Sequence, residues 1–553
     1  MKTSGPITYN KLFSRRSLVV AGSAGAVLSA VGFSKWQNLE SFFNYKNLDQ
    51  IKVKSHDLSE VGHRLRIPWV ESEYDFSHTE KISILGAGIA GLSCGYFLSK
   101  QQSKSFSIYD LGTNSGGNSD YFESDLSRAS WGAHYLPVPS AENIPLIQFL
   151  KDHKIIVGEN QGLPIYDEEY LCHDPQERLL IRGGWQNSLL PDYGLSGVEK
   201  DELKRFHDFT KKLKRAKGSD GQWVFDIPVE HSSRDEEYLV LDQESFYDFL
   251  IKNNFKSEAL HWLCNYSCLD DFGTNHRKTS AWAGLHYFCS RRPDISGADE
   301  ESILVWPEGN GFLKDKLEKS LAQPVKTQHL IRKITKQNNT FRVYIDSLMD
   351  NKKFYLETEQ IVYALPRYTY PYVADQDVKN YDQLKYNPWL VAHIKVKKSV
   401  LEKMHPLAWD TVRFLEKGLG YVNNNHQGTN PNQDEVLITS YYAFSDDSPK
   451  QEREKLRQMD SSQIRNFVLG ELEKIHLGIS TVITSIDYKI LGHAMISPQV
   501  NFIWQQRANL LPRIKDGIIF AHSDMSGMSL FEEAFYQGHQ AFETLLKDEK
   551  KHG

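Results

Sequence analysis

The sequence predicts an α/β fold in which a domain built on a parallel sheet is interrupted by a second, α+β domain. Three observations support this prediction. An apolar strand leads through closely spaced glycines into a helix at 81–102, alternating strands follow at 330–366, and a buried strand at 517–521 precedes the C-terminal helix. Strands that alternate with helices favour a parallel sheet. The stretches between these segments are long enough to form another domain.

Length and composition exclude several classes of protein. A chain of 553 residues suggests two or three domains. With 40% hydrophobic and 25% charged residues it has the composition of a globular protein, and a formal net charge of −6 argues against nucleic acid as the main partner. Five cysteines do not make a disulfide framework. No metal is expected, because the nearby histidines and cysteines match no strong zinc spacing: His261, Cys264, Cys268, His286 and Cys289.

The first 35 residues are predicted to be an export signal. Basic residues precede the apolar run 18–33. Residues 13–19, Phe-Ser-Arg-Arg-Ser-Leu-Val, resemble the twin-arginine motif of bacteria. A buried N-terminal helix with two chance arginines is the alternative. The resemblance implies export in the folded state to the periplasm, the twin-arginine machinery as a partner, and membrane association if the signal is retained. Residues 36–79 are expected to be a linker and a surface arm.

The strand at 82–85 ends in a glycine motif that predicts a dinucleotide site. Gly86, Gly88 and Gly91 have the spacing G-x-G-x-x-G. The first glycine allows the tight turn, the second lets the backbone approach a pyrophosphate, and the third lets the helix pack on the strand. Asp110 lies about 20 residues further on, at the end of the next strand, where a carboxylate can hold ribose hydroxyls. A purely structural turn is the alternative.

A second glycine pair indicates which dinucleotide is bound. Gly116-Gly117-Asn118 resembles the flavoprotein pattern of the flavin-containing amine oxidase and phytoene desaturase superfamily, in which the pair passes close to the FAD pyrophosphate. The family usually has an arginine after the two glycines. The stretch 111–118 has none, which leaves the phosphate charge to backbone amides.

Three later segments resemble the same family in the same order. Residues 306–313 resemble its Pro-x-Gly-Gly turn, and 361–366 resemble its Ala-x-Pro exit from a strand. The resemblance implies that the backbone at Ile331 touches the adenine. It also implies that Asp524 binds the ribityl chain and that the amides near Phe531 and Glu532 point at the flavin ring, where a helix N-terminus favours negative charge.

These resemblances imply an FAD-binding Rossmann-like domain of the glutathione-reductase type, made of 80–139, 301–366 and 510–553. The intervening 140–300 and 367–509 would form a discontinuous α+β substrate domain. The expected cofactor-binding residues are Gly86, Gly88, Ala90, Gly91, Asp110, Gly116, Gly117, Asn118, Gly132, Ile331, Asp524, Phe531 and Glu532.

Two residues are candidates for catalysis. His134 lies in Trp-Gly-Ala-His-Tyr at 131–135, where the family has a glycine segment under the flavin ring, although a hydrogen-bonded core histidine is equally compatible. Lys395 lies on a strand in which Val391, His393, Lys395 and Lys397 share one face. By its place it resembles the lysine that holds a water near the flavin in amine-oxidising relatives. The alternative is a solvated strand end.

The family resemblance implies an exported FAD-dependent oxidoreductase that transfers a hydride from a C–N bond of a small molecule to the flavin. A desaturase or protoporphyrinogen-oxidase-like enzyme on an apolar conjugated substrate is the first alternative. A flavin-containing binding or assembly factor without turnover is the second. An amine substrate predicts an aromatic cage with a carboxylate, and a polyene or tetrapyrrole predicts a long apolar tunnel. FAD is expected to be non-covalent, because no cysteine follows Cys289.

Overall fold

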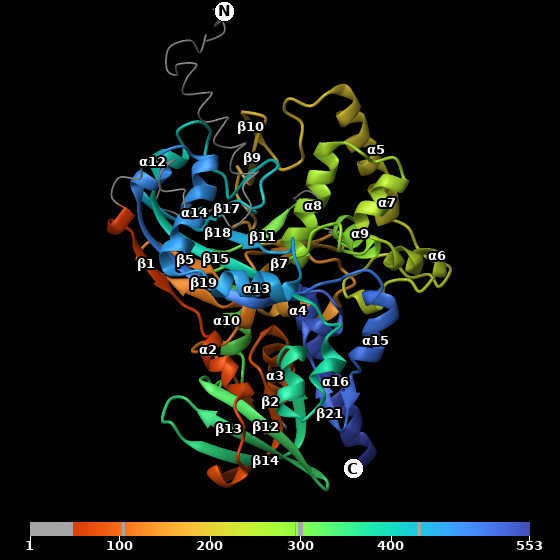
Figure 1. Cartoon of the computed structure of the whole chain (residues 1–553). Helices are drawn as coiled ribbons and strands as arrows, with labels where there is room; N and C mark the ends of the chain where they lie inside the picture. The colour runs from red at the N-terminus through yellow and green to blue at the C-terminus, as the bar shows by residue number, and fades with distance from the viewer. Residues whose placement is uncertain (1–47, 102–104, 293–294, 297–301, 429–432, 553) are drawn as a thin grey trace, which may run out of the picture.

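The structure is a computed structural model that describes residues 48–552 except 102–104, 293–294, 297–301 and 429–432. Two large sheets organise these residues, one at each end of the molecule (Figure 1). The export signal predicted at 1–35 lies outside the described residues. Within the described part of the chain, no helix is both long and apolar enough to cross a membrane.

The first sheet has seven strands and contains the glycine motif. Its strands run in the order β12-β13-β14-β2-β3, with β21 paired to β14 and β20 to β21. Their bounds are β2 Asp75–Leu85, β3 Phe106–Tyr109, β12 His329–Gln337, β13 Thr340–Ser347, β14 Lys353–Tyr363, β20 Ile514–Lys515 and β21 Ile518–Phe520. Strands β3, β2, β14 and β21 are parallel, so their carboxyl ends meet at one edge. The predicted α/β fold is therefore confirmed.

Helices α3 (Ile89–Lys100) and α16 (Phe531–His552) cover one face of this sheet. They approach so closely that a side chain at Gly538 would lie 1.9 Å from the Ser93 hydroxyl. Helix α4 (Ile144–Asp152) packs into the same core, with the rings of Phe149 and Phe535 5.3 Å apart. The first segment of this domain therefore runs to about residue 152 instead of ending at 139, because the apolar face of α4 needs this core to bury it.

The second sheet has eight strands in the order β1-β19-β15-β18-β17-β16-β9-β10. Their bounds are β1 Lys52–Ser55, β9 Glu177–Ile181, β10 Gly184–Asn187, β15 Tyr386–Lys397, β16 Asp410–Arg413, β17 Tyr421–Asn423, β18 Glu435–Ala443 and β19 Ile483–Ile496. Strands from both 140–300 and 367–509 thus share one sheet. The linker expected over 36–79 is wrong in part, since β1 forms a parallel edge strand on β19 and β2 already begins at Asp75.

Helices from 140–300 pack beside the second sheet, on the right of Figure 1. Four of them are α5 Gly197–Lys214, α7 Phe246–Lys252, α8 Glu258–Phe272 and α9 Ala281–Cys289. Local sequence explains where they start: Ser196 and Glu199 form a capping box at α5, and Ser257 accepts a hydrogen bond from the Leu260 amide at α8. Helix α9 buries Trp282 completely, so this apolar stretch is core.

Candidate functional site

The glycine turn after β2 leaves open space at the N-terminus of α3. Gly86 has a φ of +106°, which only glycine adopts without strain, and a Cβ at Gly91 would lie 1.9 Å from the Gly86 carbonyl oxygen. A Cβ at Gly88 would meet nothing within 4 Å. Gly88 caps α3 without a side-chain hydrogen bond, so the first amides of the helix are left for an anion. Ala90 is buried in that first turn.

Asp110 holds this turn together. Its carboxylate accepts hydrogen bonds from the amides of Ala87 and Gly112, each at 2.7 Å. Burial raises the pKa of Asp110. Each oxygen keeps a further lone pair, which a ribose hydroxyl can use. The Asp110 carbonyl accepts the His329 amide at 2.7 Å, and this bond places Ile331, two residues along β12, beside the acid.

The second glycine pair lies against the first turn. Gly116 and Gly117 both have positive φ, and Gly116 donates its amide to the Ala87 carbonyl at 2.8 Å. The Asn118 side chain donates to the Ala494 carbonyl at 2.7 Å, so it ties this turn to β19. A Cβ at Gly132 would lie 2.4 Å from the Asn118 carbonyl oxygen. The segment 131–135 is therefore held close to the glycine pair.

Asp524 and the start of α16 are the remaining parts of the predicted dinucleotide site. The Oδ2 atom of Asp524 accepts from the Arg367 amide at 2.9 Å and from the Tyr386 hydroxyl at 2.7 Å. Its Oδ1 atom is buried and lies 3.2 Å from His522 Nδ1, which accepts the Asp524 amide, so Oδ1 keeps a lone pair for a ligand hydroxyl. Helix α16 begins at Phe531, whose amide and that of Glu532 belong to the unbonded first turn. Glu532 is buried, with Oε1 3.7 Å from Arg291 Nε.

Lys395 does not lie among these groups. Its ammonium forms an ion pair with Asp125, whose side chain is 75% exposed. This position fits the alternative of a solvated strand end. It does not fit the expectation that Lys395 holds a water near the flavin. His393, two residues earlier on the same face, is fully buried with its ring 4.1 Å from that of Trp131. Its Nε2 atom has no partner among the described residues. The sequence pattern named His393 but gave no reason to prefer it.

His134 lies where the sequence predicted, on the segment beside the glycine pair. Its ring is 4.7 Å from that of Tyr441 on β18. Its Nε2 atom is buried without a hydrogen-bond partner in the described part of the chain. Burial lowers the pKa of His134 to about 4, so the imidazole is neutral at pH 7.

Tyr441 belongs to a cluster of tyrosines and carboxylates for which the sequence showed no motif. We define it as Tyr135, Tyr266, Asp270, Tyr287, Asp410 and Tyr441. The Tyr135 hydroxyl donates to Asp270 at 3.3 Å, and the Tyr266 hydroxyl donates to Asp410 at 3.4 Å. Asp410 is 5% exposed, and its Oδ1 atom has no hydrogen-bond partner among the described residues.

The surroundings shift the two carboxyl groups of the cluster toward their neutral forms, and Arg291 offsets this only in part at Asp270. Within the described residues neither Asp270 nor Asp410 has a basic side chain within 4.0 Å, whereas Arg291 donates to Asp271 at 3.3 Å. Burial and the neighbouring Asp271 raise the pKa of Asp270 to about 7. Burial, Glu177 and Asp270 raise the pKa of Asp410. A cationic ligand would relieve this repulsion.

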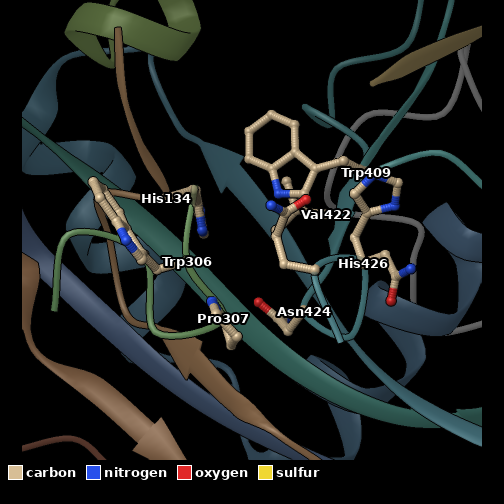
Figure 2. A pocket seen from close by; sticks show the side chains of 10 residues that line it. His134, Trp306, Pro307, Trp409, Val422, Asn424 and His426 are labelled. Carbon is tan, nitrogen blue, oxygen red and sulfur yellow. The ribbon is translucent and has the colours of Figure 1, made fainter. Parts of the chain in front are cut away.

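A small pocket adjoins the cluster (Figure 2). His134 and Trp409 line it and also contact the cluster, since the Trp409 ring is 5.7 Å from that of Tyr135. In Figure 2, His134 and Trp306 lie on one side, and Trp409, Asn424 and His426 lie on the other. The remaining lining residues are Pro307, Gly309, Val422, Asn423 and Gln427. Aromatic walls and amide groups suit a small organic molecule.

The cysteines have no part in this site. Cys264 and Cys268 are buried in α8, as their helical spacing predicted. Among the described residues, no group of three or more histidine, cysteine or acidic side chains could hold a metal ion.

Comparisons with known proteins define the class to which this fold belongs. Residues 84–152 match the family model described as NAD(P)-binding Rossmann-like domain. No curated protein sequence is significantly similar to the chain.

Solved structures extend the likeness over most of the chain. A putrescine oxidase bound to putrescine matches with a TM-score of 0.62 and 14% identity, over 85% of this chain and 100% of that one. Cyclohexylamine oxidase from Brevibacterium oxydans matches with 0.59 and 13%, over 85% and 100%. A putative protoporphyrinogen oxidase from Exiguobacterium matches with 0.56 and 13%, over 85% and 99%. The chain therefore has the fold of flavin amine oxidase structures.

Proposed function

We propose that this protein is an FAD-dependent oxidoreductase that removes a hydride from the C–N bond of a cationic amine. The observation that carries the proposal is the buried Asp410 carboxyl group, whose Oδ2 atom accepts from the Tyr266 hydroxyl and whose Oδ1 atom has no hydrogen-bond partner among the described residues. His134 and Tyr135 connect this cluster to the segment that lies against the two glycine turns. A dinucleotide site and a cation site thus share one short segment of chain.

The residues present fit FAD. The open space at Gly88 and the free amides of α3 suit a pyrophosphate, Asp110 suits a ribose, and the Oδ1 atom of Asp524 suits a ribityl hydroxyl. The first amides of α16 suit the electron-rich edge of the ring. When bound, FAD supplies the acceptor for a hydride, and the protein supplies orientation and electrostatics. Non-covalent binding stays a prediction.

The cluster would bind the substrate and take up its proton. A primary ammonium R-CH2-NH3⁺ becomes the iminium R-CH=NH2⁺ by losing one hydride from carbon and one proton from nitrogen. Asp270, with a pKa of about 7, is placed to accept that proton. Asp410 would hold the remaining positive charge, and the aromatic rings of Tyr135, Trp409 and Tyr441 would pack on the carbon chain. Water would then hydrolyse the iminium to a carbonyl compound and ammonia.

The same cluster disfavours the two alternatives. An apolar conjugated substrate would bring no positive charge to Asp270 and Asp410. It would leave both carboxyl groups desolvated without a counter-ion, which is costly. A protein that only binds FAD, without turnover, needs no proton acceptor beside the segment 131–135.

Anaerobic titration tests the proposed function. Purified protein is expected to be yellow, and a small primary amine or diamine should bleach its flavin absorbance band without oxygen. Bleaching by a porphyrinogen or polyene but by no amine would replace the proposal with the first alternative. A flavin that no substrate class reduces would point to the binding factor.

We also propose that the protein is exported by the twin-arginine route, which the sequence at 13–19 supports. Replacing both Arg15 and Arg16 with lysine keeps the charge but changes the motif. The double variant is expected to accumulate in the cytoplasm. Normal periplasmic recovery of the variant, measured by cell fractionation, would contradict this proposal.

A further inference from the structure

Lys489 is a half-buried lysine on β19. It lies opposite Val391 of β15, on the face that carries the buried His393. Its ammonium is 5.6 Å from the centre of the Trp131 ring. Burial lowers the pKa of Lys489, which shows that the charged form is poorly solvated there.

Lys489 has no counter-ion within reach. Among the described residues, no carboxylate lies within 4.0 Å of its ammonium, whereas the ammonium groups of Lys314 and Lys474, which are also largely shielded from solvent, each form such ion pairs. The carboxylates that act on it from further away are those of Asp120, Asp57 and Asp110. An ammonium that is half-buried without a partner loses part of its solvation, and nothing nearby compensates for that loss.

Trp131 and Asp120 link Lys489 to the glycine pair. Trp131, whose ring it approaches, donates its amide to the Asp120 carbonyl at 2.9 Å. The Asp120 amide donates to the Gly117 carbonyl at 3.2 Å, and the only atom within 4 Å of a Cβ built at Gly117 is the Gly88 Cα. Lys489 is thus linked to the glycine pair through Trp131 and Asp120, and its charge acts on Asp120 and Asp110.

The glycine pair itself lacks a cation. The stretch 111–118 contains no lysine or arginine, and the Asn118 side chain is engaged by the Ala494 carbonyl of the same strand β19. The stem of the buried Lys314 lies against Gly116, with its Cγ atom 3.0 Å from a Cβ built there, but its ammonium is already paired with Asp315 and Glu318. A further cation would therefore help to balance a pyrophosphate that carries two negative charges.

We propose that Lys489 is the counter-charge for the pyrophosphate of the bound dinucleotide. This inference rests on the proposed FAD cofactor. It assigns a cofactor-binding role to a residue far along the chain from the glycine motifs, and it gives a reason for a half-buried ammonium that has no carboxylate within 4.0 Å among the described residues.

The test is the affinity of apoprotein for FAD, measured by quenching of flavin fluorescence at several salt concentrations. Lys489→Met is expected to raise Kd about tenfold or more and to weaken its dependence on salt, because a charge-assisted contact is lost. Lys489→Arg should bind nearly as wild type. Lys397→Met, an exposed change on the neighbouring strand, is the matched control and should leave Kd unchanged.

Two further readouts separate this role from others. Apoprotein carrying Lys489→Met is expected to unfold at a temperature equal to or above that of wild-type apoprotein, because the unpaired charge is gone. An unchanged Kd with a lowered flavin reduction potential would mean that the ammonium serves the reduced ring, and would overturn the proposal. An unchanged Kd and potential would overturn it as well. Failure of wild-type protein to bind any FAD would instead reject the proposed function.

Discussion

Replacing Gly88 with alanine is expected to abolish FAD retention while leaving the fold of the apoprotein intact. A Cβ at this position meets no protein atom within 4 Å, so the apoprotein can accommodate it. The same open space is where a pyrophosphate would approach the α3 amides, and a methyl group there would push the phosphates away. We expect colourless protein after dialysis and a thermal unfolding midpoint within about 1 °C of wild-type apoprotein, since the change leaves packing untouched.

Gly91→Ala is the matched control. Its Cβ would lie 1.9 Å from the Gly86 carbonyl oxygen and 3.3 Å from the Ala364 side chain. The helix must then move away from the strand, at a cost of about 1–3 kcal/mol or more. This variant should lower the unfolding midpoint with or without FAD. A Gly88→Ala protein that stays yellow, or that unfolds as readily as Gly91→Ala, would contradict the dinucleotide interpretation.

The second large effect is expected at Asp270. Asp270→Asn keeps the shape of the side chain and an acceptor for the Tyr135 hydroxyl, but it removes the charge. Losing a charge-assisted contact to an ammonium costs about 1.5–3 kcal/mol. We therefore expect kcat/KM for an amine substrate to fall by about 10- to 150-fold, with FAD content unchanged.

The pH dependence shows whether the charge is responsible. The pKa of Asp270 is about 7, so the carboxyl is neutral below that pH and ionised above it. Binding of a quaternary ammonium ion, which has no proton to lose, should strengthen as the pH rises through 7. In Asp270→Asn this rise should be smaller, since only Asp410 is left to titrate. Equal rises in both proteins, measured from the inhibition constant, would exclude Asp270 from the cation site.

The sequence predicted the parts of the fold that depend on local rules. The glycine spacing at 86–91 requires a tight turn and a close helix, and the apolar alternation in 330–366 requires paired strands. Asp110 could be named from its spacing after the glycines, and Asp524 from the resemblance of its segment to the C-terminal strand and helix of the flavin-containing family. Such signals are short in range, and they survive in a chain with only about 14% identity to solved relatives.

What the sequence could not predict depends on contacts between distant segments. Lys395 and His393 share one strand face, and only the arrival of Asp125 from another domain segment decides which of them is solvated. The tyrosine–carboxylate cluster joins α8, β16 and β18, whose residues are scattered over the sequence without a motif. Lys489 gave no signal at all, because an isolated lysine in a strand usually lies in water.

The pairing of β1 with β19 bears on when this chain can fold. Lys52 lies opposite Ser485, and in the other sheet Tyr363 of β14 lies beside both Leu85 of β2 and Phe520 of β21. Each sheet thus needs strands from both ends of the chain. Contacts of such long range form slowly, and neither sheet can close while the C-terminal residues are still being synthesised.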